Sequence, residues 1–202
     1  SSNRRQRQMC IRDSYWSLPA IVEQTEGQLL GEEEAGHKLR ELLHDAVRLQ
    51  IRSDVPLGIH LTGGLDSSAL LWCVRQHIDD SSQIRAFTGA YDDPSYDEVP
   101  FALAAAESAC SILHKTARIH PHEFWEIASS TQYAQEQPFG GLPTMVYWQL
   151  ESVINASGIK VVLEGQGGDE LFGGYRYYLG EHLADLSRET GSSEEVNMYR
   201  QY

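Results

Sequence analysis

Two glycine-rich segments carry the residues whose types could do chemistry. The first, residues 62–68, reads Thr-Gly-Gly-Leu-Asp-Ser-Ser and follows a short apolar stretch. Its two glycines allow a sharp turn and close approach of a ligand, and the start of a following helix offers free N–H groups that bind anions. Asp66 would repel a phosphate there, so we expect it to hold a divalent cation that bridges to the phosphates. The spacing is not that of a Walker A loop.

The second segment, residues 163–175, also follows an apolar stretch and reads Leu-Glu-Gly-Gln-Gly-Gly-Asp-Glu-Leu-Phe-Gly-Gly-Tyr. Two such loops, each carrying one aspartate, would face each other across the carboxyl edge of a parallel sheet, where these sheets bind ligands. The ordinary alternative for the first segment is a strand–turn–helix in which Asp66 or Ser67 is an N-cap. This alternative is less favoured because the second segment repeats the same arrangement of glycines and an aspartate after a strand. Arg176 and the tyrosines beside it could contact a substrate carboxylate, but a packed aromatic edge is favoured.

The elements that must position these segments alternate along the chain. Apolar residues spaced as in an amphipathic helix begin at Leu39 and run to Val47, and we expect this helix to end near Arg52. Residues 24–34 are polar and are predicted to be an exposed loop. The alternation predicts an α/β fold with a mostly parallel sheet flanked by helices. The expected strands are 57–61, 84–91, 113–119 and 160–163; the expected helices are 66–77, 97–110, 121–135 and 142–156, with a turn at 79–82 and Gly158 as a C-cap.

These segments resemble a known superfamily. Residues 62–68 are similar to the pyrophosphate loop (Ser-Gly-Gly-x-Asp-Ser) of the ATP pyrophosphatases, which GMP, NAD and argininosuccinate synthetases and tRNA-thiolating enzymes share. Residues 165–175 resemble the motif that marks the asparagine synthetase branch, and residues 91–98 and 136–140 agree with it. The resemblance covers roughly residues 15 to 180. It implies the synthetase domain of a glutamine-hydrolysing asparagine synthetase, with a fold like that of the adenine nucleotide alpha hydrolases.

The resemblance implies that ATP activates a carboxylate as an acyl-adenylate, with release of pyrophosphate, and that ammonia then forms the amide. Asp66 and Asp169 are the implied Mg²⁺ ligands, and with Gln166 they form the implied catalytic set. The residues implied to bind ATP and its pyrophosphate are His60, Leu61, Thr62, Gly63, Gly64, Leu65, Asp66, Ser67, Ser68, Gly89, Glu164 and Gly165.

Three positions depart from the family pattern. His60 and Gly89 stand where relatives usually carry aliphatic residues, so the adenine contact can differ here; a buried imidazole satisfied inside the sheet is the alternative for His60. Gln166 replaces an acid that is thought to assist the attack of ammonia, and an amide cannot act as a general base. Aspartate is the expected acceptor. A uronic-acid sugar, a cyclase of the β-lactam or lasso-peptide type, and a non-catalytic nucleotide-binding protein remain open.

Composition narrows the classes of protein. The chain has 202 residues and a formal net charge of −13, which argues against a nucleic-acid partner. No apolar run is long enough for a membrane helix. The three cysteines are far apart and form no metal motif, as in a reduced, cytoplasmic protein. The expected partners are therefore a small carboxylate and ammonia or glutamine, with a glutaminase domain in cis; a homodimer is left open.

The ends of the chain differ from its middle. Residues 1–14 are basic against the acidic trend and resemble a translated sequencing adapter, so we expect a non-native leader. A basic arm for an acidic partner is the alternative. Residues 15–34 are expected to be a linker after a missing glutaminase domain. We expect a C-terminally truncated synthetase domain over residues 35–190 and a truncated tail over residues 191–202.

Overall fold

The computed structural model describes residues 14–25, 30–78, 84–109, 113–118 and 120–189. The chain divides into two compact units, Ser1–Leu42 and Leu43–Tyr202. The expected turn at 79–82, the tail at 191–202 and the leader except for Ser14 lie outside the described residues.

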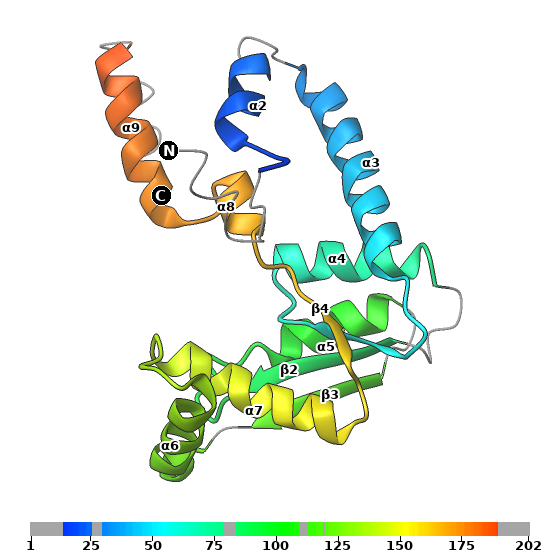
Figure 1. Ribbon diagram of the computed structural model, residues 1–202, viewed down its shortest axis with the longest axis vertical. Helices are drawn as coiled ribbons and strands as arrows, with labels where there is room; N and C mark the ends of the chain where they lie inside the picture. The colour runs from blue at the N-terminus through cyan, green and yellow to red at the C-terminus, as the bar shows by residue number, and fades with distance from the viewer. Residues whose placement is uncertain (1–13, 26–29, 79–83, 110–112, 119, 190–202) are drawn as a thin grey trace, which may run out of the picture. The chain divides into compact units, whose positions relative to one another are not determined.

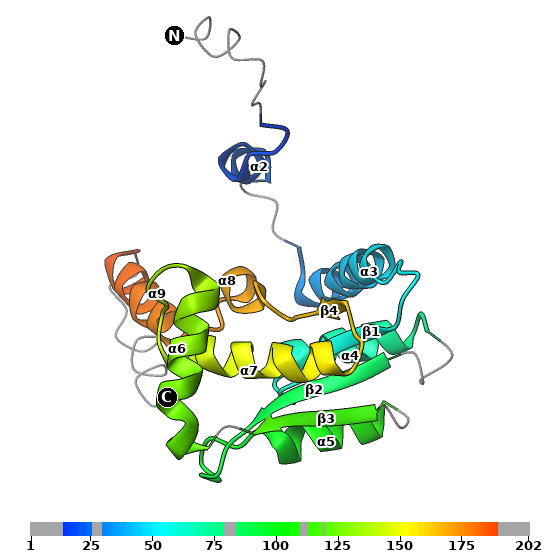
Figure 2. The same ribbon diagram turned by 60° about the horizontal axis from the view of Figure 1, so that its bottom comes forward.

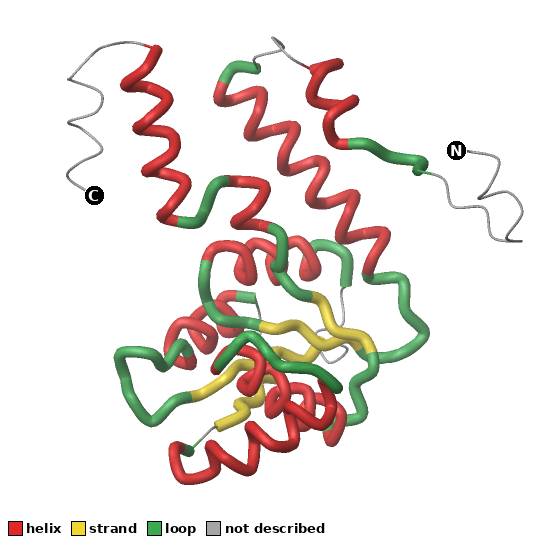
Figure 3. The backbone as a smooth tube through the Cα atoms, turned by 60° about the vertical axis from the view of Figure 1, so that its left-hand side comes forward, coloured by secondary structure: helices red, strands yellow, loops and turns green. Residues whose placement is uncertain are grey.

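The second unit is built on a parallel sheet of four strands in the order β3-β2-β1-β4 (Figures 1 and 3). The strands are β1 (Leu57–His60), β2 (Ile84–Ala90), β3 (Leu113–Arg118) and β4 (Val161–Leu163). Because β4 pairs with β1 in parallel, with Ile59 opposite Leu163, the two glycine-rich segments leave neighbouring strands at the same edge of the sheet. This confirms the predicted α/β fold and its parallel sheet.

Helices cover both faces of this sheet, as Figures 1 and 2 show. On one face, α4 (Leu65–Arg75) and α5 (Val99–Ser108) supply Leu71, Val74 and Ala102 to a core that contains Ile59 from β1. On the other face, α7 (Leu142–Ala156) packs Leu150 and Ile154 against Phe87 of β2. Every residue of β1 is buried, as expected for a strand covered on both sides.

The elements after β3 complete the second unit. A 3₁₀ turn η2 (Pro121–Glu123) leads into α6 (Phe124–Gln135), where a single helix had been expected. The C-cap of α7 is Ser157, one residue before the predicted Gly158, which follows the cap in a left-handed conformation with a φ of +73°. After β4, two helices were not predicted, α8 (Gly168–Phe172) inside the second glycine-rich segment and α9 (Arg176–Glu189) after it.

The predicted loop over residues 24–34 is wrong at both ends. Helix α2 (Leu18–Thr25) enters it, and α3 (Glu32–Gln50) begins inside it. The three glutamates 32–34 occupy the first turn of α3, where negative charge stabilises the positive end of a helix. Of the apolar stripe on α3, Val47 is buried, whereas Leu39 and Leu42 remain exposed.

Candidate active site

The first glycine loop, residues 62–68, joins the end of β1 to the start of α4. Gly63 has a φ of +79°, and a Cβ at this position would lie 2.6 Å from the backbone nitrogen of Ala102 on α5. Glycine is therefore required both for the turn and for the contact with α5. The Thr62 hydroxyl accepts a hydrogen bond from the Gly64 N–H at 3.1 Å and lies 3.0 Å from the Ser67 hydroxyl.

Helix α4 begins without a side-chain cap. Its N-cap is Gly64, so the alternative in which Asp66 or Ser67 caps the helix is wrong. Leu65, the first residue of α4, is exposed, and Ser67 is buried. The N–H groups of the first turn therefore lack a side-chain acceptor of their own, as an anion site requires.

The second glycine loop, residues 164–175, lies against Asp66. A Cβ on Gly165 would lie 3.0 Å from the Asp66 Cβ, and one on Gly168 would lie 2.7 Å from the Asp66 carboxylate carbon. Asp169 follows directly in the first turn of α8, and the Gly174 N–H donates to its carbonyl oxygen at 3.0 Å. The structure thus brings the Asp66 side chain into contact with the segment that carries Asp169.

A cavity of about 190 Å³ opens at the carboxyl ends of β1 and β2, and we call it the strand-end cavity. Three features that the sequence singled out line it, namely His60, Gly89 and residues 61–62. A Cβ on Gly89 would lie 2.8 Å from the Val146 Cγ1 of α7, so the missing side chain keeps this wall open. Sequence reasoning did not find the lining residues Tyr91, Glu98, Pro143, Val146, Tyr147 and Leu150.

Two of these missed residues are titratable. Burial raises the pKa of the Glu98 carboxyl, and burial followed by the nearby charge of Glu98 raises the pKa of the Tyr91 hydroxyl. Both belong to residues 91–98, the stretch that contributed to the family resemblance, which was the available signal for them.

A second cavity, of about 280 Å³, lies between the C-terminal half of α3, α4 and α8. We call it the second-loop cavity. Asp66, Glu164 and Gln166 line it together with apolar side chains such as Leu70 and Phe172. The predicted site residues are therefore divided between two cavities, with His60 and Gly89 in one and Asp66, Glu164 and Gln166 in the other.

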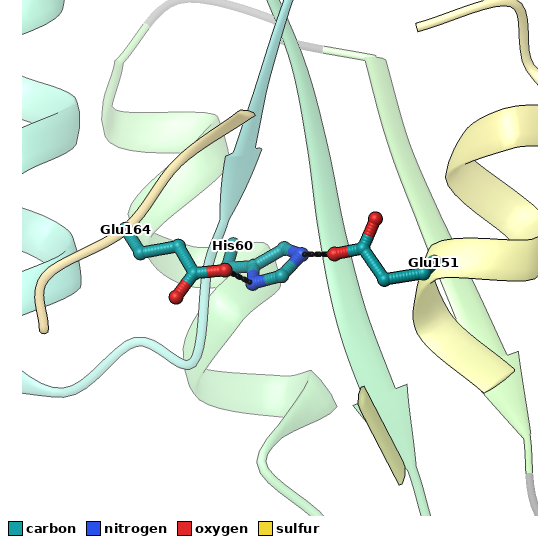
Figure 4. A group of neighbouring side chains, drawn as sticks. All are labelled: His60, Glu151 and Glu164. Atoms are coloured by element: carbon teal, nitrogen blue, oxygen red, sulfur yellow. Dashed lines mark ion pairs between the residues drawn. The ribbon is translucent and has the colours of Figure 1, made fainter. Parts of the chain in front are cut away.

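His60 connects these two groups of residues. Its Nδ1 lies 2.8 Å from the Glu164 Oε1, and its Nε2 lies 3.2 Å from the Glu151 Oε1 of α7 (Figure 4). The residue is only 7% exposed, and neither ring nitrogen makes an aligned hydrogen bond. Both ring nitrogens thus face carboxylates, and the alternative of an imidazole satisfied inside the sheet stays a prediction. Glu151 gave no signal in the sequence, because it is one polar residue on an amphipathic helix.

Gln166 is held by a neighbouring tyrosine. Its Nε2 donates a hydrogen bond of 2.8 Å to the Tyr147 hydroxyl, whose ring lies 5.5 Å from that of His60. The amide is thus used as a donor.

The tyrosines after the second loop contact one another. The Tyr175 and Tyr177 rings stack at 5.3 Å, and the Tyr175 hydroxyl donates to Glu170 at 2.8 Å. A hydrogen bond with Tyr178 raises the pKa of Tyr177 to about 12. These contacts favour the packed aromatic edge over a carboxylate-binding group.

The asparagine synthase family matches residues 38–200. The chain belongs to the asparagine synthase family. It is 32% identical over 182 residues to a putative glutamine-hydrolysing asparagine synthetase of Methanocaldococcus jannaschii, covering 87% of this chain and 32% of the relative. An amidase of Gibberella zeae is 28% identical over 183 residues, covering 85% and 27%, respectively. The chain thus spans between 21% and 32% of the length of the curated relatives it matches.

Among solved structures, an ammonia-dependent NAD synthetase from Campylobacter jejuni is similar to this chain. The TM-score is 0.46 and the sequence identity 14%, with 69% of this chain and 60% of the synthetase covered. Within the described residues, no helix is both long and apolar enough to cross a membrane.

Proposed function

We propose that this chain is the ATP-using part of an enzyme that amidates a carboxylate, with aspartate as the acceptor and asparagine as the product. The carboxylate oxygen attacks the α-phosphorus of ATP and pyrophosphate leaves. Ammonia then attacks the acyl carbon, a proton is lost, and AMP leaves. The observation that carries this proposal is the contact of Asp66 in the first glycine loop with Gly165 and Gly168 of the second.

The first glycine loop suits the pyrophosphate. The uncapped N–H groups at the start of α4 and the hydroxyls of Thr62, Ser67 and Ser68 offer donors to phosphate oxygens. In this proposal residues 60–68 with Gly89, Glu164 and Gly165 bind ATP, and the strand-end cavity receives the nucleoside. The cavity lies where parallel α/β sheets bind ligands.

Asp66 and Asp169 suit Mg²⁺, because carboxylate oxygens are its preferred ligands and two loop glycines leave the Asp66 carboxylate unobstructed. When bound there, Mg²⁺ neutralises phosphate charge. Asp66 and Asp169 would hold it from the two loops. Gln166 then acts as a positioning group and not as a base, so ammonia attacks in its neutral form.

Relatives named as glutamine-hydrolysing support a glutaminase domain in cis that supplies the ammonia. The net charge of −13 supports a small-molecule acceptor over a nucleic acid. ATP and glutamine are cytoplasmic metabolites, so we propose that the enzyme acts there.

The test uses the full-length protein with ammonia supplied directly. AMP and pyrophosphate release from Mg²⁺-ATP would be measured with aspartate and with uronic-acid sugars, and the amide identified by mass spectrometry. We expect release with aspartate and loss of at least about 100-fold in kcat/KM in Asp66→Asn. Release with a sugar acid alone would move the acceptor to uronic acids, and release without external ammonia would indicate a cyclase. No release with any acid, from folded protein, would overturn the proposal.

A further inference from the structure

The peptide between Leu61 and Thr62, where the first glycine loop begins, is held at both of its polar groups by side-chain hydroxyls. Its carbonyl oxygen, on Leu61, accepts a hydrogen bond from the Thr88 hydroxyl of β2. Its N–H, on Thr62, donates to the Ser67 hydroxyl of α4 at 3.2 Å. Leu61 is 0% and Thr88 2% exposed, so the carbonyl is shielded from bulk water. The orientation of this peptide is therefore set by β2 on one side and by α4 on the other.

The Thr88 hydroxyl is itself placed by His114 of β3. Its oxygen lies 2.7 Å from the His114 Nε2. A carbonyl can only accept, so the single hydroxyl proton of Thr88 is used for Leu61, and Nε2 is the donor in the contact with His114. Burial lowers the pKa of His114 and so favours the neutral ring, whose one N–H is enough for this bond. Two hydrogen bonds in series thus run from β3 through β2 to the end of β1.

The loop needs this support because its own backbone supplies little restraint. The Leu61 N–H donates to the Phe87 carbonyl at 2.9 Å, which continues the pairing of β1 with β2 by one residue. Gly63 and Gly64 follow, and glycine has more backbone freedom than any other residue. A rotation of the Leu61–Thr62 peptide would redirect the loop and, with it, the N–H groups at the start of α4. The hydroxyls that hold this peptide therefore fix where those donors point.

We propose that Thr88 is a positioning residue, which holds the Leu61 carbonyl and thereby sets the affinity of the first glycine loop for the pyrophosphate part of ATP. The inference rests on the proposed function, because the ligand of the loop is the one proposed there. Without the Thr88 hydroxyl the buried carbonyl loses its partner, and the loop samples other directions. The loop binds the phosphates before and during the reaction, so the loss falls on binding and not on the rate of the bound complex.

Thr131 of α6 offers a matched control. It is 1% exposed, as buried as Thr88, and its hydroxyl has no hydrogen-bond partner among the residues that the structure describes. Threonine to valine removes one buried hydroxyl at nearly constant volume at either position. Only at position 88 does the change remove a contact with the first glycine loop. The difference between the two variants therefore isolates that contact.

The first experiment needs no nucleotide. Amide hydrogen exchange of the full-length protein, followed by mass spectrometry, measures how readily the hydrogen bonds of each segment open. In Thr88→Val we expect residues 61–68 to exchange about tenfold faster than in the parent, while residues 142–156 of α7 are unchanged. Thr88→Ser, which keeps the hydroxyl, and Thr131→Val should both match the parent.

Two exchange results would overturn the proposal. One is exchange of residues 61–68 in folded Thr88→Val at the rate of the parent. The other is equal acceleration of residues 61–68 and 142–156, which would indicate a purely structural role. Should Thr88→Val not fold, Thr88→Cys takes its place, because a thiol is only a weak donor.

The second experiment measures affinity. The full-length protein is titrated calorimetrically with inorganic pyrophosphate in the presence of Mg²⁺. We expect the Kd to rise about tenfold in Thr88→Val and to change less than about twofold in Thr88→Ser and Thr131→Val. The KM for ATP in acid-dependent pyrophosphate release should rise about tenfold as well, while kcat changes less than about threefold.

A fall in kcat at unchanged KM, or an equal loss of affinity in Thr131→Val, would refute the positioning role. His114 acts through Thr88, so adding His114→Gln to Thr88→Val should raise the KM no further, and additive effects would contradict the series of hydrogen bonds. If the exchange result holds but the parent neither binds pyrophosphate nor releases it from ATP with any acid, the proposed function fails and the support of the loop by Thr88 stands.

Discussion

Gly63 offers the sharpest test of how the first glycine loop is built. Its φ is +79°, and an added Cβ would lie 2.5 Å from the Phe101 Cβ and 2.6 Å from the Ala102 backbone nitrogen. Both atoms belong to α5 at its first turns, where a backbone shift would disturb the core packing of Ala102. Gly63→Ala therefore carries two separate costs, one conformational and one steric.

Gly158 isolates the conformational cost. Its φ is +73°, close to that of Gly63, and a Cβ there would meet nothing within 4 Å. An alanine held in the left-handed conformation destabilises the folded state by about 1–2 kcal/mol. About 0.4–1 kcal/mol of this is offset, because alanine also lowers the conformational entropy of the unfolded chain. We therefore expect Gly158→Ala to lower the free energy of unfolding by about 1 kcal/mol. Overlap with packed backbone adds about 1–3 kcal/mol, so Gly63→Ala should lose about 2–4 kcal/mol.

Urea unfolding of the two variants and the parent, followed by circular dichroism, measures both losses. A difference of at least about 1 kcal/mol between the variants is expected. Equal losses, within about 0.5 kcal/mol, would show that the loop does not pack against α5 as described, and the placement of residues 62–68 would have to be revised.

Two further predictions concern the site and the sheet. Gly168→Ala would place a methyl group 2.7 Å from the Asp66 carboxylate carbon, and the Asp66 side chain would rotate away to avoid it. Pyrophosphate release should therefore fall about 100-fold, while the urea midpoint changes little. A variant as active as the parent would contradict the contact. Burial lowers the pKa of His114, so the folded protein binds fewer protons than the unfolded chain and stability should fall as the pH drops through the ordinary range of an imidazole. His114→Gln should reduce this acid sensitivity in urea unfolding between about pH 7.5 and 5.5, and an unchanged slope in His114→Gln would refute the assignment.

The regular elements could be predicted from local patterns. Helix α7 was expected at the bounds the structure gives, because Pro143 suits its first turn and its apolar residues recur with helical spacing. The strands were placed within one residue at each end. β4 is a short apolar run and apolar residues dominate β2, whereas β3 is mostly polar. Helix α3 begins earlier than expected, because three glutamates form its first turn and such a polar composition is typical of a loop.

The site was only partly visible in the sequence. Loops 62–68 and 164–175 signalled phosphate chemistry because their glycines allow close approach of a ligand, the helix start after the first loop offers free N–H groups, and each loop carries an aspartate that suits a bridging cation. Glu151 and Tyr147 carried no such signal, since polar residues on a helix are ordinary until a neighbour is known. Their partner His60 is about 90 residues away in sequence, and the contact arises because β1 lies between β2 and β4 with α7 across it.

Exchange of labelled pyrophosphate into ATP by the full-length protein, with Mg²⁺ and aspartate but no ammonia, tests the central claim most directly. Exchange requires reversible attack of the acid on ATP, so it reports the acyl-adenylate itself. We expect exchange that depends on the acid, is lost in Asp66→Asn, and is retained in Gly36→Ala, where a Cβ meets open space. Exchange in Asp66→Asn equal to that of the parent, or none with any acid in folded protein, would contradict the account.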